Sequence, residues 1–203
     1  MGDAAAEAEQ FTPDGPVVLV LGAPGSGKDT QCDRLVQKLG GCHLSTVDLV
    51  REAVESKTTQ GTKISNMIRA GQIPTAQVYL DLLKDAMRQR KGPYLIQGFP
   101  KAIDHLRDFE AQCGSCSGAI FLRAGEETLT QRLLERGKTS NRTDDTPQAI
   151  ARRFRTFQLE CIPVVEQLEA RGLISDLDAA QTADEVFDAA CAAYGRIIKV
   201  ISA

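Results

Sequence analysis

A glycine-rich loop between an apolar run and an amphipathic segment limits the folds open to this chain more than any other feature. The loop has the sequence Gly22-Ala23-Pro24-Gly25-Ser26-Gly27-Lys28. The run before it, 17–21, is apolar and β-branched like a buried strand, and apolar side chains recur at helical spacing over 30–39. Main-chain N–H groups can surround a phosphate only where side chains leave room, hence the glycines. The start of the helix and the cation of Lys28 add attraction, so we predict a phosphate-binding loop.

The position after the lysine departs from the usual P-loop pattern. A Ser or Thr that binds Mg²⁺ is common there, whereas this chain has Asp29. The departure puts a negative charge beside the expected phosphates, so it bears on any activity assigned to the loop.

The size and composition favour one domain that is soluble and intracellular. The chain has 203 residues, a formal net charge of −3 and 42% hydrophobic residues, enough for one core and a small insertion. It has no basic block, so we expect no nucleic acid and no membrane as partner. It also has no apolar run of transmembrane length and no signal-peptide pattern. We expect a cytoplasmic monomer.

The chain has six cysteines. Four of them fall in apolar patterns and are expected to be buried like small hydrophobic residues: Cys32, Cys42, Cys161 and Cys191. Cys113 and Cys116 form a C-x-x-C pair in an expected loop. Because a zinc site of this kind usually needs a second pair, we favour loop thiols, open to oxidation, over a metal site.

Strand-like runs alternate with helical patterns along most of the chain. The expected strands cover 17–21, 42–45, 94–97, 119–122 and 173–177. This alternation predicts an α/β fold, a P-loop NTPase-type parallel five-stranded sheet flanked by helices. Helical patterns over 48–90 predict a small helical insertion between the second and third strands. Residues 1–16 lack a periodic pattern and are expected to form a flexible N-terminal leader.

Three further expectations concern single side chains. The helix over 126–136 should turn Leu129, Leu133 and Leu134 inward. The helix that opens at 146–147 should kink near Pro163. His43 lies near no cluster of metal ligands, so we interpret it as a packed or strand-edge residue.

The carboxyl ends of parallel strands meet at one edge, where such sheets bind ligands. Four segments should therefore gather there: the P-loop, 45–46, 97–98 and Arg123. Cations follow in neighbouring segments: Arg51, Lys101, Arg132, Arg136, Lys138, Arg142, Arg152, Arg153 and Arg155. Any one of them alone is more simply explained as part of a solvated helix face. Phosphoryl transfer between two anions nevertheless needs several cations.

Four segments carry a combined pattern that is more specific than the P-loop. They are 22–31 (GAPGSGKDTQ), 43–51 (HLSTVDLVR), 94–101 (YLIQGFPK) and 135–145 (ERGKTSNRTDD). Together they resemble the adenylate kinase family of nucleoside monophosphate kinases, from about Val17 to the C-terminal helix. The segment from Arg136 to Arg142 contains no zinc-bearing or β-rich insert, which is similar to the short-lid branch.

The resemblance implies a phosphotransferase that makes two nucleoside diphosphates from ATP and a nucleoside monophosphate, with Mg²⁺ as cofactor and AMP as preferred acceptor. It implies one nucleoside monophosphate kinase domain over 17–203, with an acceptor-binding flap at about 45–75 and a short lid at about 136–146. Closure of both would keep water from taking the phosphoryl group.

The matching positions imply a role for each residue. ATP would be bound by Gly25, Ser26, Gly27, Lys28, Asp29, Thr30 and Arg136. The acceptor would be bound by Thr46, Arg51, Gln72, Ile73, Gly98, Phe99, Lys101, His105, Arg142 and Arg153. The transferring phosphoryl group would be stabilised by Lys28, Arg51, Lys101, Arg136, Arg142 and Arg153.

The chain departs from the family at five positions. The family has Gly at Asp29 and Val47, Asp at Gln97, Arg at Lys101 and Gln at His105. Lys101 keeps the positive charge but loses the two-pronged grip of a guanidinium. The amide of Gln97 is a poor substitute for a carboxylate that orders the waters around Mg²⁺.

Two opposed hypotheses follow for the acidic residue in the loop. In the first, Asp29 ligates Mg²⁺ in place of the missing carboxylate, with Thr30 in contact through water, and activity survives. In the second, Asp29 repels the ATP phosphates, and the chain is a weak or inactive nucleotide-binding or structural module. We favour a working enzyme, because a scaffold has no structural reason to keep the arginines of the site.

The sequence leaves one alternative to AMP phosphorylation and disfavours another. Thr46 resembles the AMP-specific branch, whereas His105 matches neither branch, so a UMP/CMP kinase stays an alternative. A P-loop GTPase is disfavoured because no Asn-Lys-x-Asp base-reading motif follows a later strand.

Overall fold

The computed structural model describes residues 10–56, 58–69, 74–140 and 145–199. Its strands form one parallel sheet in the order β2-β3-β1-β4-β5. They are β1 (Val17–Gly22), β2 (Cys42–Ser45), β3 (Tyr94–Gln97), β4 (Gly118–Arg123) and β5 (Ile174–Asp178). The predicted P-loop NTPase-type sheet is thereby confirmed. β1 lies at its centre, so the loop that follows β1 opens in the middle of the carboxyl edge.

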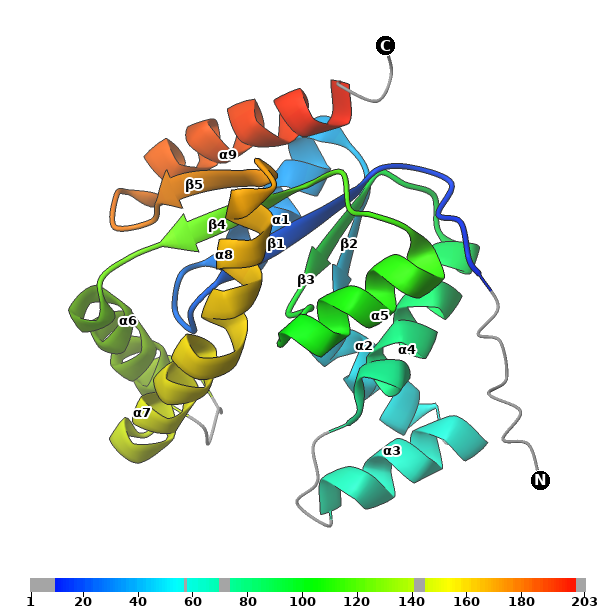
Figure 1. The fold of residues 1–203 in the computed structure, drawn as a ribbon. Coiled ribbons are helices and arrows are strands. Elements are labelled where there is room, and N and C mark those ends of the chain that lie inside the picture. The colour runs from blue at the N-terminus through cyan, green and yellow to red at the C-terminus, as the bar shows by residue number, and fades with distance from the viewer. Residues whose placement is uncertain (1–9, 57, 70–73, 141–144, 200–203) are drawn as a thin grey trace.

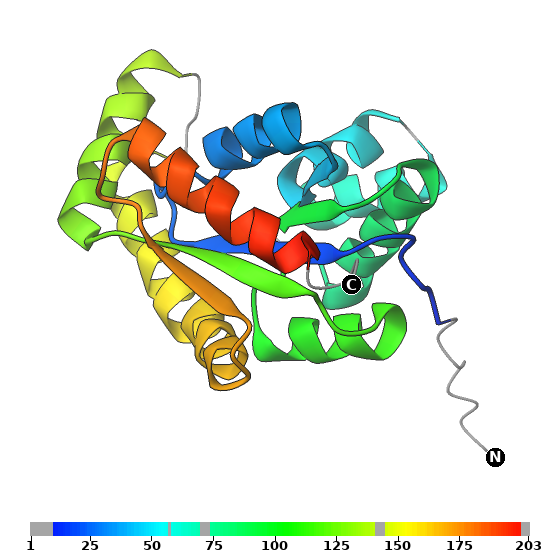
Figure 2. The same ribbon diagram turned by 90° about the horizontal axis from the view of Figure 1, so that it is seen from above.

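Helices cover both faces of the sheet. They are α1 (Lys28–Leu39), α2 (Thr46–Glu55), α3 (Thr59–Arg69), α4 (Ala76–Gln89), α5 (Ile103–Cys113), α6 (Glu126–Thr139), α7 (Pro147–Thr156), α8 (Ile162–Ala170) and α9 (Ala183–Lys199). A π-helical turn, η1 (Phe157–Cys161), joins α7 to α8. Figure 1 shows the expected insertion, α2 to α4, on one side of the carboxyl edge and α6 with α7 on the other. Seen from above, α1 and α9 lie on one face, and α5 and α8 on the opposite face (Figure 2).

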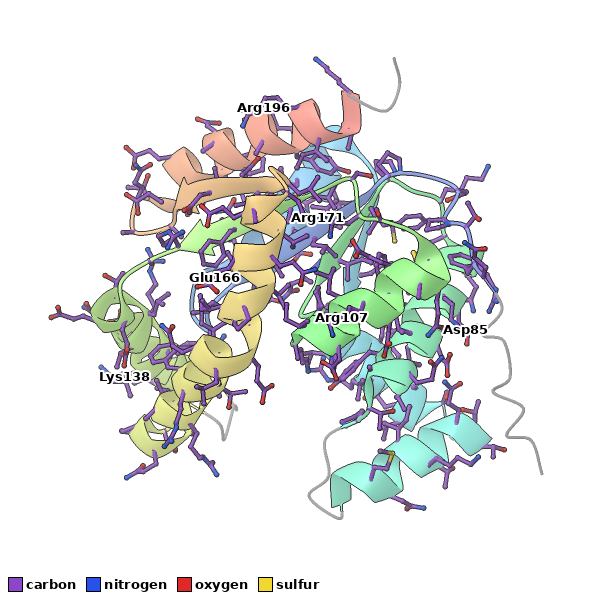
Figure 3. All side chains as sticks on the ribbon, viewed as in Figure 1. Asp85, Arg107, Lys138, Glu166, Arg171 and Arg196 are labelled. Carbon is purple, nitrogen blue, oxygen red and sulfur yellow. The ribbon has the colours of Figure 1, made fainter. Side chains whose placement is uncertain are left out.

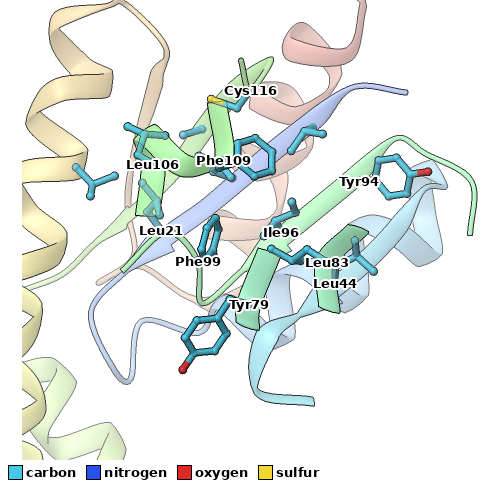
Figure 4. Close-up of a cluster of buried hydrophobic side chains, with 14 of the residues drawn as sticks. Leu21, Leu44, Tyr79, Leu83, Tyr94, Ile96, Phe99, Leu106, Phe109 and Cys116 are labelled. Carbon is cyan, nitrogen blue, oxygen red and sulfur yellow. The ribbon is translucent and has the colours of Figure 1, made fainter. Parts of the chain in front are cut away.

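The alternation of side chains along β1 builds two cores. Val18 and Val20 point toward the core under α1 and α9, where Leu35 and Tyr194 are also fully buried. Their neighbours on β1, such as Leu19, point to the larger core on the other face. Figure 4 shows part of that larger core, in which side chains from the strands meet those of α4 and α5. Both faces are therefore apolar, as a doubly covered parallel sheet requires.

The helix α6 corrects one expectation about burial. Leu129 and Leu133 are 3% and 1% exposed, as predicted, whereas Leu134 is 37% exposed. Positions four apart share a helix face, and Leu134 lies about 100° around the axis from Leu133. It therefore faces away from the core, and the prediction for Leu134 was wrong.

The helix that precedes Pro163 is irregular, but the irregularity lies one turn earlier than expected. The N–H of Ile162 donates to the carbonyl oxygen of Phe157, five residues back, which is the pattern of a π-helical turn. Pro163 then falls in the first turn of α8, where its missing N–H leaves no intrahelical bond unmade. The regular α-helix α7 thus ends at Thr156, before the proline.

The cysteines are free thiols, and only Cys116 of the C-x-x-C pair lies in the expected loop. Cys113 is the last residue of α5, and it and Cys116 are only 6% and 4% exposed because both pack into the larger core. Burial raises the pKa of each to about 11, which disfavours the reactive thiolate. Of the other four, Cys32 is buried as expected, and the rest are half-buried: Cys42, Cys161 and Cys191.

The packed part of the chain begins before Val17, the boundary that the pattern had suggested. The N–H of Phe11 donates to the carbonyl oxygen of Gln112 at 2.7 Å, and its ring packs against the larger core. The carboxylate of Asp14 accepts from the N–H of Gly92 at 3.2 Å and from the phenol of Tyr94. An isolated aromatic residue has no periodicity, so the sequence carried no signal for these contacts.

Within the described residues, no helix is both long and apolar enough to cross a membrane.

Candidate functional site

The P-loop lies at the carboxyl end of β1, and its backbone explains its glycines. Gly25 has a φ of 84°, and a Cβ atom there would lie 2.9 Å from the carbonyl oxygen of Leu129 in α6. Gly27, the residue before α1, has a φ of 86° with no atom within 4 Å of such a Cβ. The loop is therefore packed tightly against α6 at one glycine and faces open space at the other, where its N–H groups can meet an anion.

Lys28 folds back over this loop. Its Nζ donates to the carbonyl oxygens of Gly22 at 2.7 Å and Ala23 at 2.9 Å, and to Oγ of Ser26 at 3.3 Å. Burial lowers the pKa of Lys28 to about 8, and the positive charge of Arg153 acts in the same direction. The ammonium group thus has hydrogen-bond partners, but its positive charge is only partly offset. Phosphate oxygens would offset it further.

Asp29 and Thr30 occupy the first turn of α1 and are exposed. The negative charge of Asp29 raises the pKa of the neighbouring Lys28 and partly opposes the effect of burial. A carboxylate and a hydroxyl at this point are oxygen donors of the kind that Mg²⁺ prefers. Position and chemistry are therefore compatible with the proposed metal contact.

Gln97, at the end of β3, is buried and hydrogen-bonded. Its Oε1 lies 3.0 Å from Nε2 of His43, and Nδ1 of His43 lies 2.8 Å from Oδ1 of Asp33 in α1. The side chain of His43 is 14% exposed, which agrees with its interpretation as a packed residue. Sequence reasoning missed that this histidine links α1 to the position where the family has an acidic residue.

Asp145 brings two of the expected arginines together. Its side chain is fully buried; Oδ1 and Oδ2 accept from Arg136 at 2.8 Å each, and Oδ1 also accepts from Arg153 at 3.0 Å. Both arginines keep about a third of their surface exposed. The hydrogen bonds from Arg136, followed by those from Arg153, hold the pKa of Asp145 below its ordinary value. The sequence predicted no role for Asp145, and its only signal there was its place at the end of 135–145.

On the other side of the P-loop, Thr46 and the turn after β3 form a tight contact. Oγ1 of Thr46 donates to the carbonyl oxygens of Gln97 at 3.3 Å and Gly98 at 3.1 Å. Gly98 has a φ of 78°, and a Cβ there would lie 2.7 Å from that hydroxyl. Thr46 is 1% exposed, so in this structure its hydroxyl is turned to the protein backbone.

Two aromatic rings lie against His105. Its ring stacks on Phe99 with centroids 5.5 Å apart, and Tyr79 lies 6.1 Å away. Burial lowers the pKa of His105, which favours the neutral imidazole. Its Nδ1 is buried and has no hydrogen-bond partner in the described part of the chain. Lys101 lies beside the same rings, and its Nζ donates to the phenol oxygen of Tyr79 at 2.9 Å.

The remaining expected cations either pair with other residues, lie exposed on the surface or fall outside the described residues. Arg51 pairs with Asp48 at 2.7 Å on the surface of α2 and keeps 59% of its side chain exposed. Arg132 donates to the carbonyl oxygen of Ala179 and Arg123 pairs with Asp176, so both connect the elements around β5. The other cations considered from the sequence, Lys138, Arg152 and Arg155, are exposed. Figure 3 shows Lys138 on α6. The expected site residues Gln72, Ile73 and Arg142 lie outside the described residues.

Comparisons with known proteins show which family this sequence is similar to. The family model described as adenylate kinase matches residues 20–173.

The chain belongs to the adenylate kinase family.

Several curated relatives carry the family name. Adenylate kinase isoenzyme 1 of Homo sapiens is 40% identical over 179 residues, which cover 86% of this chain and 92% of the relative. Adenylate kinase 1 of Schistosoma mansoni is 40% identical over 175 residues, covering 85% and 89%. The Caenorhabditis elegans isoenzyme 1 is 37% identical over 176 residues, covering 85% and 84%. The adenylate kinase resemblance and the prediction of a phosphotransferase acting on nucleoside monophosphates are thereby confirmed.

Proposed function

We propose that this adenylate kinase family member transfers the terminal phosphoryl group of ATP to AMP, reversibly and with Mg²⁺, to give two ADP. The observation that carries the proposal is the cluster around Asp145. This carboxylate positions Arg136 and Arg153, and Arg153 is close enough to Lys28 for its charge to lower the pKa of the lysine. Several cations converge near one P-loop, as transfer between two anions requires.

Each part of the site has a separate task in this proposal. The P-loop and Lys28 hold the ATP phosphates, and Arg136 and Arg153 neutralise the charge that spreads over the transferring group. Arg51 and Lys101 approach the acceptor phosphate from the opposite side. The flap, about 45–75, and the lid, about 136–146, would enclose both nucleotides and exclude water. Their roles rest on the family resemblance.

Magnesium would neutralise charge on the ATP phosphates and hold them in position for transfer. Within the described residues, no three His, Cys, Asp or Glu side chains form a group that could hold a metal ion. A Mg²⁺ ion bound mainly by phosphates and waters, with one carboxylate, suits such a site. Asp29 would supply that carboxylate, with Thr30 in contact through water.

The choice of AMP rests on the acceptor side of the site. Thr46 packs against the turn at Gly98. Because Nδ1 of His105 is buried, the neutral imidazole would pair with a base through Nε2. A UMP/CMP kinase is the alternative, because the same imidazole can pair with a pyrimidine. The coupled assay of diphosphate formation from ATP with AMP, CMP, UMP and GMP separates these options. AMP should give the highest kcat/KM, and activity should disappear with EDTA and return with Mg²⁺.

The alternative of a weak or inactive module is favoured by one observation, the hydrogen bond between Gln97 and His43. It occupies the amide oxygen that would otherwise serve as the substitute for a carboxylate. If none of the four monophosphates reacts while diadenosine pentaphosphate still binds, the chain is a nucleotide-sensing or structural module.

Asp29→Gly decides between the two hypotheses for the loop. We expect activity to collapse in this variant and to return when Gln97→Asp is added, because a carboxylate is then restored near the metal. If activity instead rises and the Mg²⁺ requirement is unchanged, Asp29 acts by repulsion and is not a ligand. The location in the cytoplasm and the monomeric state stay predictions, and sedimentation of the full chain tests the latter.

A further inference from the structure

Tyr79 of α4 makes a contact with Lys101 that the sequence motifs did not suggest. The Nζ atom of Lys101 donates to the phenol oxygen at 2.9 Å and also lies 4.4 Å from the centroid of the ring. In the described part of the chain, no carboxylate forms an ion pair with Lys101. The ammonium is therefore positioned by a neutral group, and its charge is left for an anion.

The ring of Tyr79 is anchored, whereas its hydroxyl lies at the margin of the core. The residue is 4% exposed, and its ring centroid lies 6.4 Å from that of Phe99 and 6.1 Å from that of His105. Figure 4 shows the phenol oxygen pointing away from the labelled apolar side chains. A rigid ring thus carries one polar atom to the acceptor side of the site.

Hydrogen-bond chemistry gives this hydroxyl a second capacity. The phenol oxygen accepts a hydrogen bond from Lys101, so its own O–H group remains free to donate one. The pair therefore presents two donor atoms, an ammonium nitrogen and a phenol oxygen, 2.9 Å apart. A guanidinium offers two donors in one planar fork, whereas an ammonium alone is a single charged point.

The turn that carries Lys101 is fixed as well. The main-chain carbonyl oxygen of Lys101 accepts from Sγ of Cys161 in η1 at 3.2 Å. Both the backbone and the side chain of Lys101 are therefore held before a ligand arrives, which reduces the entropy lost on binding.

We propose that Tyr79 binds the acceptor phosphate together with Lys101, as the second prong that a lysine at this position lacks. The proposal deepens the proposed function and rests on its placement of the acceptor at Lys101. It makes Tyr79 a residue that contacts substrate, and it predicts that the effect belongs to the phosphate and not to the base.

The test is Tyr79→Phe, which keeps the ring and removes only the hydroxyl. The Kd of AMP, measured by calorimetry without ATP, should rise about tenfold, the equivalent of one lost charge-assisted hydrogen bond. CMP, UMP and GMP should lose a similar factor wherever they bind, while the KM of ATP changes less than twofold. Adding Lys101→Arg to Tyr79→Phe should restore most of the AMP affinity, because the guanidinium supplies both donors.

Tyr194→Phe is the matched control. Its hydroxyl donates to the carbonyl oxygen of Gly40 at 3.3 Å, in the core on the other face of the sheet, so its loss should leave the Kd of AMP unchanged. The proposal is overturned if Tyr79→Phe leaves the Kd of AMP unchanged, or if it raises the Kd of AMP and the KM of ATP by the same factor. Wild-type protein that binds AMP but does not phosphorylate it contradicts the proposed function alone, since calorimetry of Tyr79→Phe still decides the role of the hydroxyl. Wild-type protein that binds none of the four monophosphates contradicts both.

Discussion

Arg136 donates two hydrogen bonds, each 2.8 Å long, to the two carboxylate oxygens of Asp145. The carboxylate is fully buried, and Arg153 binds one of its oxygens from α7. α6 and α7 are thus joined at the point where both present an arginine to the site. A charge-assisted, two-pronged contact of this kind fixes direction as well as distance.

Asp145→Asn should lower kcat more than it raises the KM of either nucleotide. The amide cannot accept two bonds from Arg136 and one from Arg153, so both guanidinium groups lose their fixed positions. We expect a loss of kcat of about tenfold to a hundredfold, which corresponds to about 1.4–2.7 kcal/mol. Steady-state kinetics with ATP and AMP varied in turn measure the split, and an effect confined to KM would contradict the role of Asp145.

The same variant gives a prediction for stability against pH. The folded-state pKa of Asp145 lies below the ordinary value of 3.8, so its contribution is fully present above that value and is lost as the pH falls through the folded-state pKa. Urea unfolding should show Asp145→Asn to be less stable than wild type at pH 7. The difference should shrink below pH 3.8. A difference that does not depend on pH would mean that packing and not charge is responsible.

Lys28 should give the free enzyme a titration near its pKa of about 8. Burial disfavours the cation, and the neutral amine binds phosphates poorly, so kcat/KM for ATP should fall as the pH rises above about 8. In Lys28→Arg the site keeps its charge throughout, so the remaining activity should lack this inflection. The unfolded chain binds more protons than the folded one between about 8 and the ordinary value of 10.5, so this lysine's contribution to stability rises with pH in that window.

Gly25→Ala should destabilise the protein and weaken ATP binding. The residue has a φ of 84°, which costs an L-residue about 1–2 kcal/mol. The new methyl would also lie 2.9 Å from the carbonyl oxygen of Leu129 and push the loop away from α6. Gly114→Ala is the matched control, because its φ is 80° and nothing lies within 4 Å of the added atom. Thermal unfolding should show a clearly larger loss of Tm for Gly25→Ala, and equal losses would mean that backbone strain alone is responsible.

His43→Ala should reduce kcat by roughly fivefold, the effect of about one neutral hydrogen bond. Without the hydrogen bond between Nε2 and Gln97, the amide of Gln97 is free to rotate at the carboxyl end of β3. Asp33→Asn is the control, since the amide that replaces the carboxylate can pair with Nδ1 of the histidine as donor or as acceptor, and it should change kcat less than twofold. Activity of His43→Ala equal to wild type would show that the orientation of Gln97 is unimportant.

Local patterns in the sequence determined the architecture. The run before the P-loop, the glycines within it and the alternation of strands with helices predicted a parallel sheet with its ligand edge at the loop. These features could be predicted because neighbours along the chain generate them: glycine permits a φ that other residues avoid, and periodicity sets which face is buried. The same reasoning was wrong for Leu134, because apolar content does not say which way a side chain near the edge of a helix face points. It also placed Cys113 in a loop, although this residue ends α5.

Only the tertiary structure decided the partners within the site. Asp145 meets Arg153 across a helix boundary, His43 meets Gln97 from the neighbouring strand, and Tyr79 of α4 meets Lys101. None of these pairs is marked by spacing, because each depends on strand register and on the side from which one helix packs on another. The sequence determined that cations and a phosphate loop would share one edge. The packed fold decided which neutral or acidic group holds each cation, since burial makes a partner necessary and only packing can supply it.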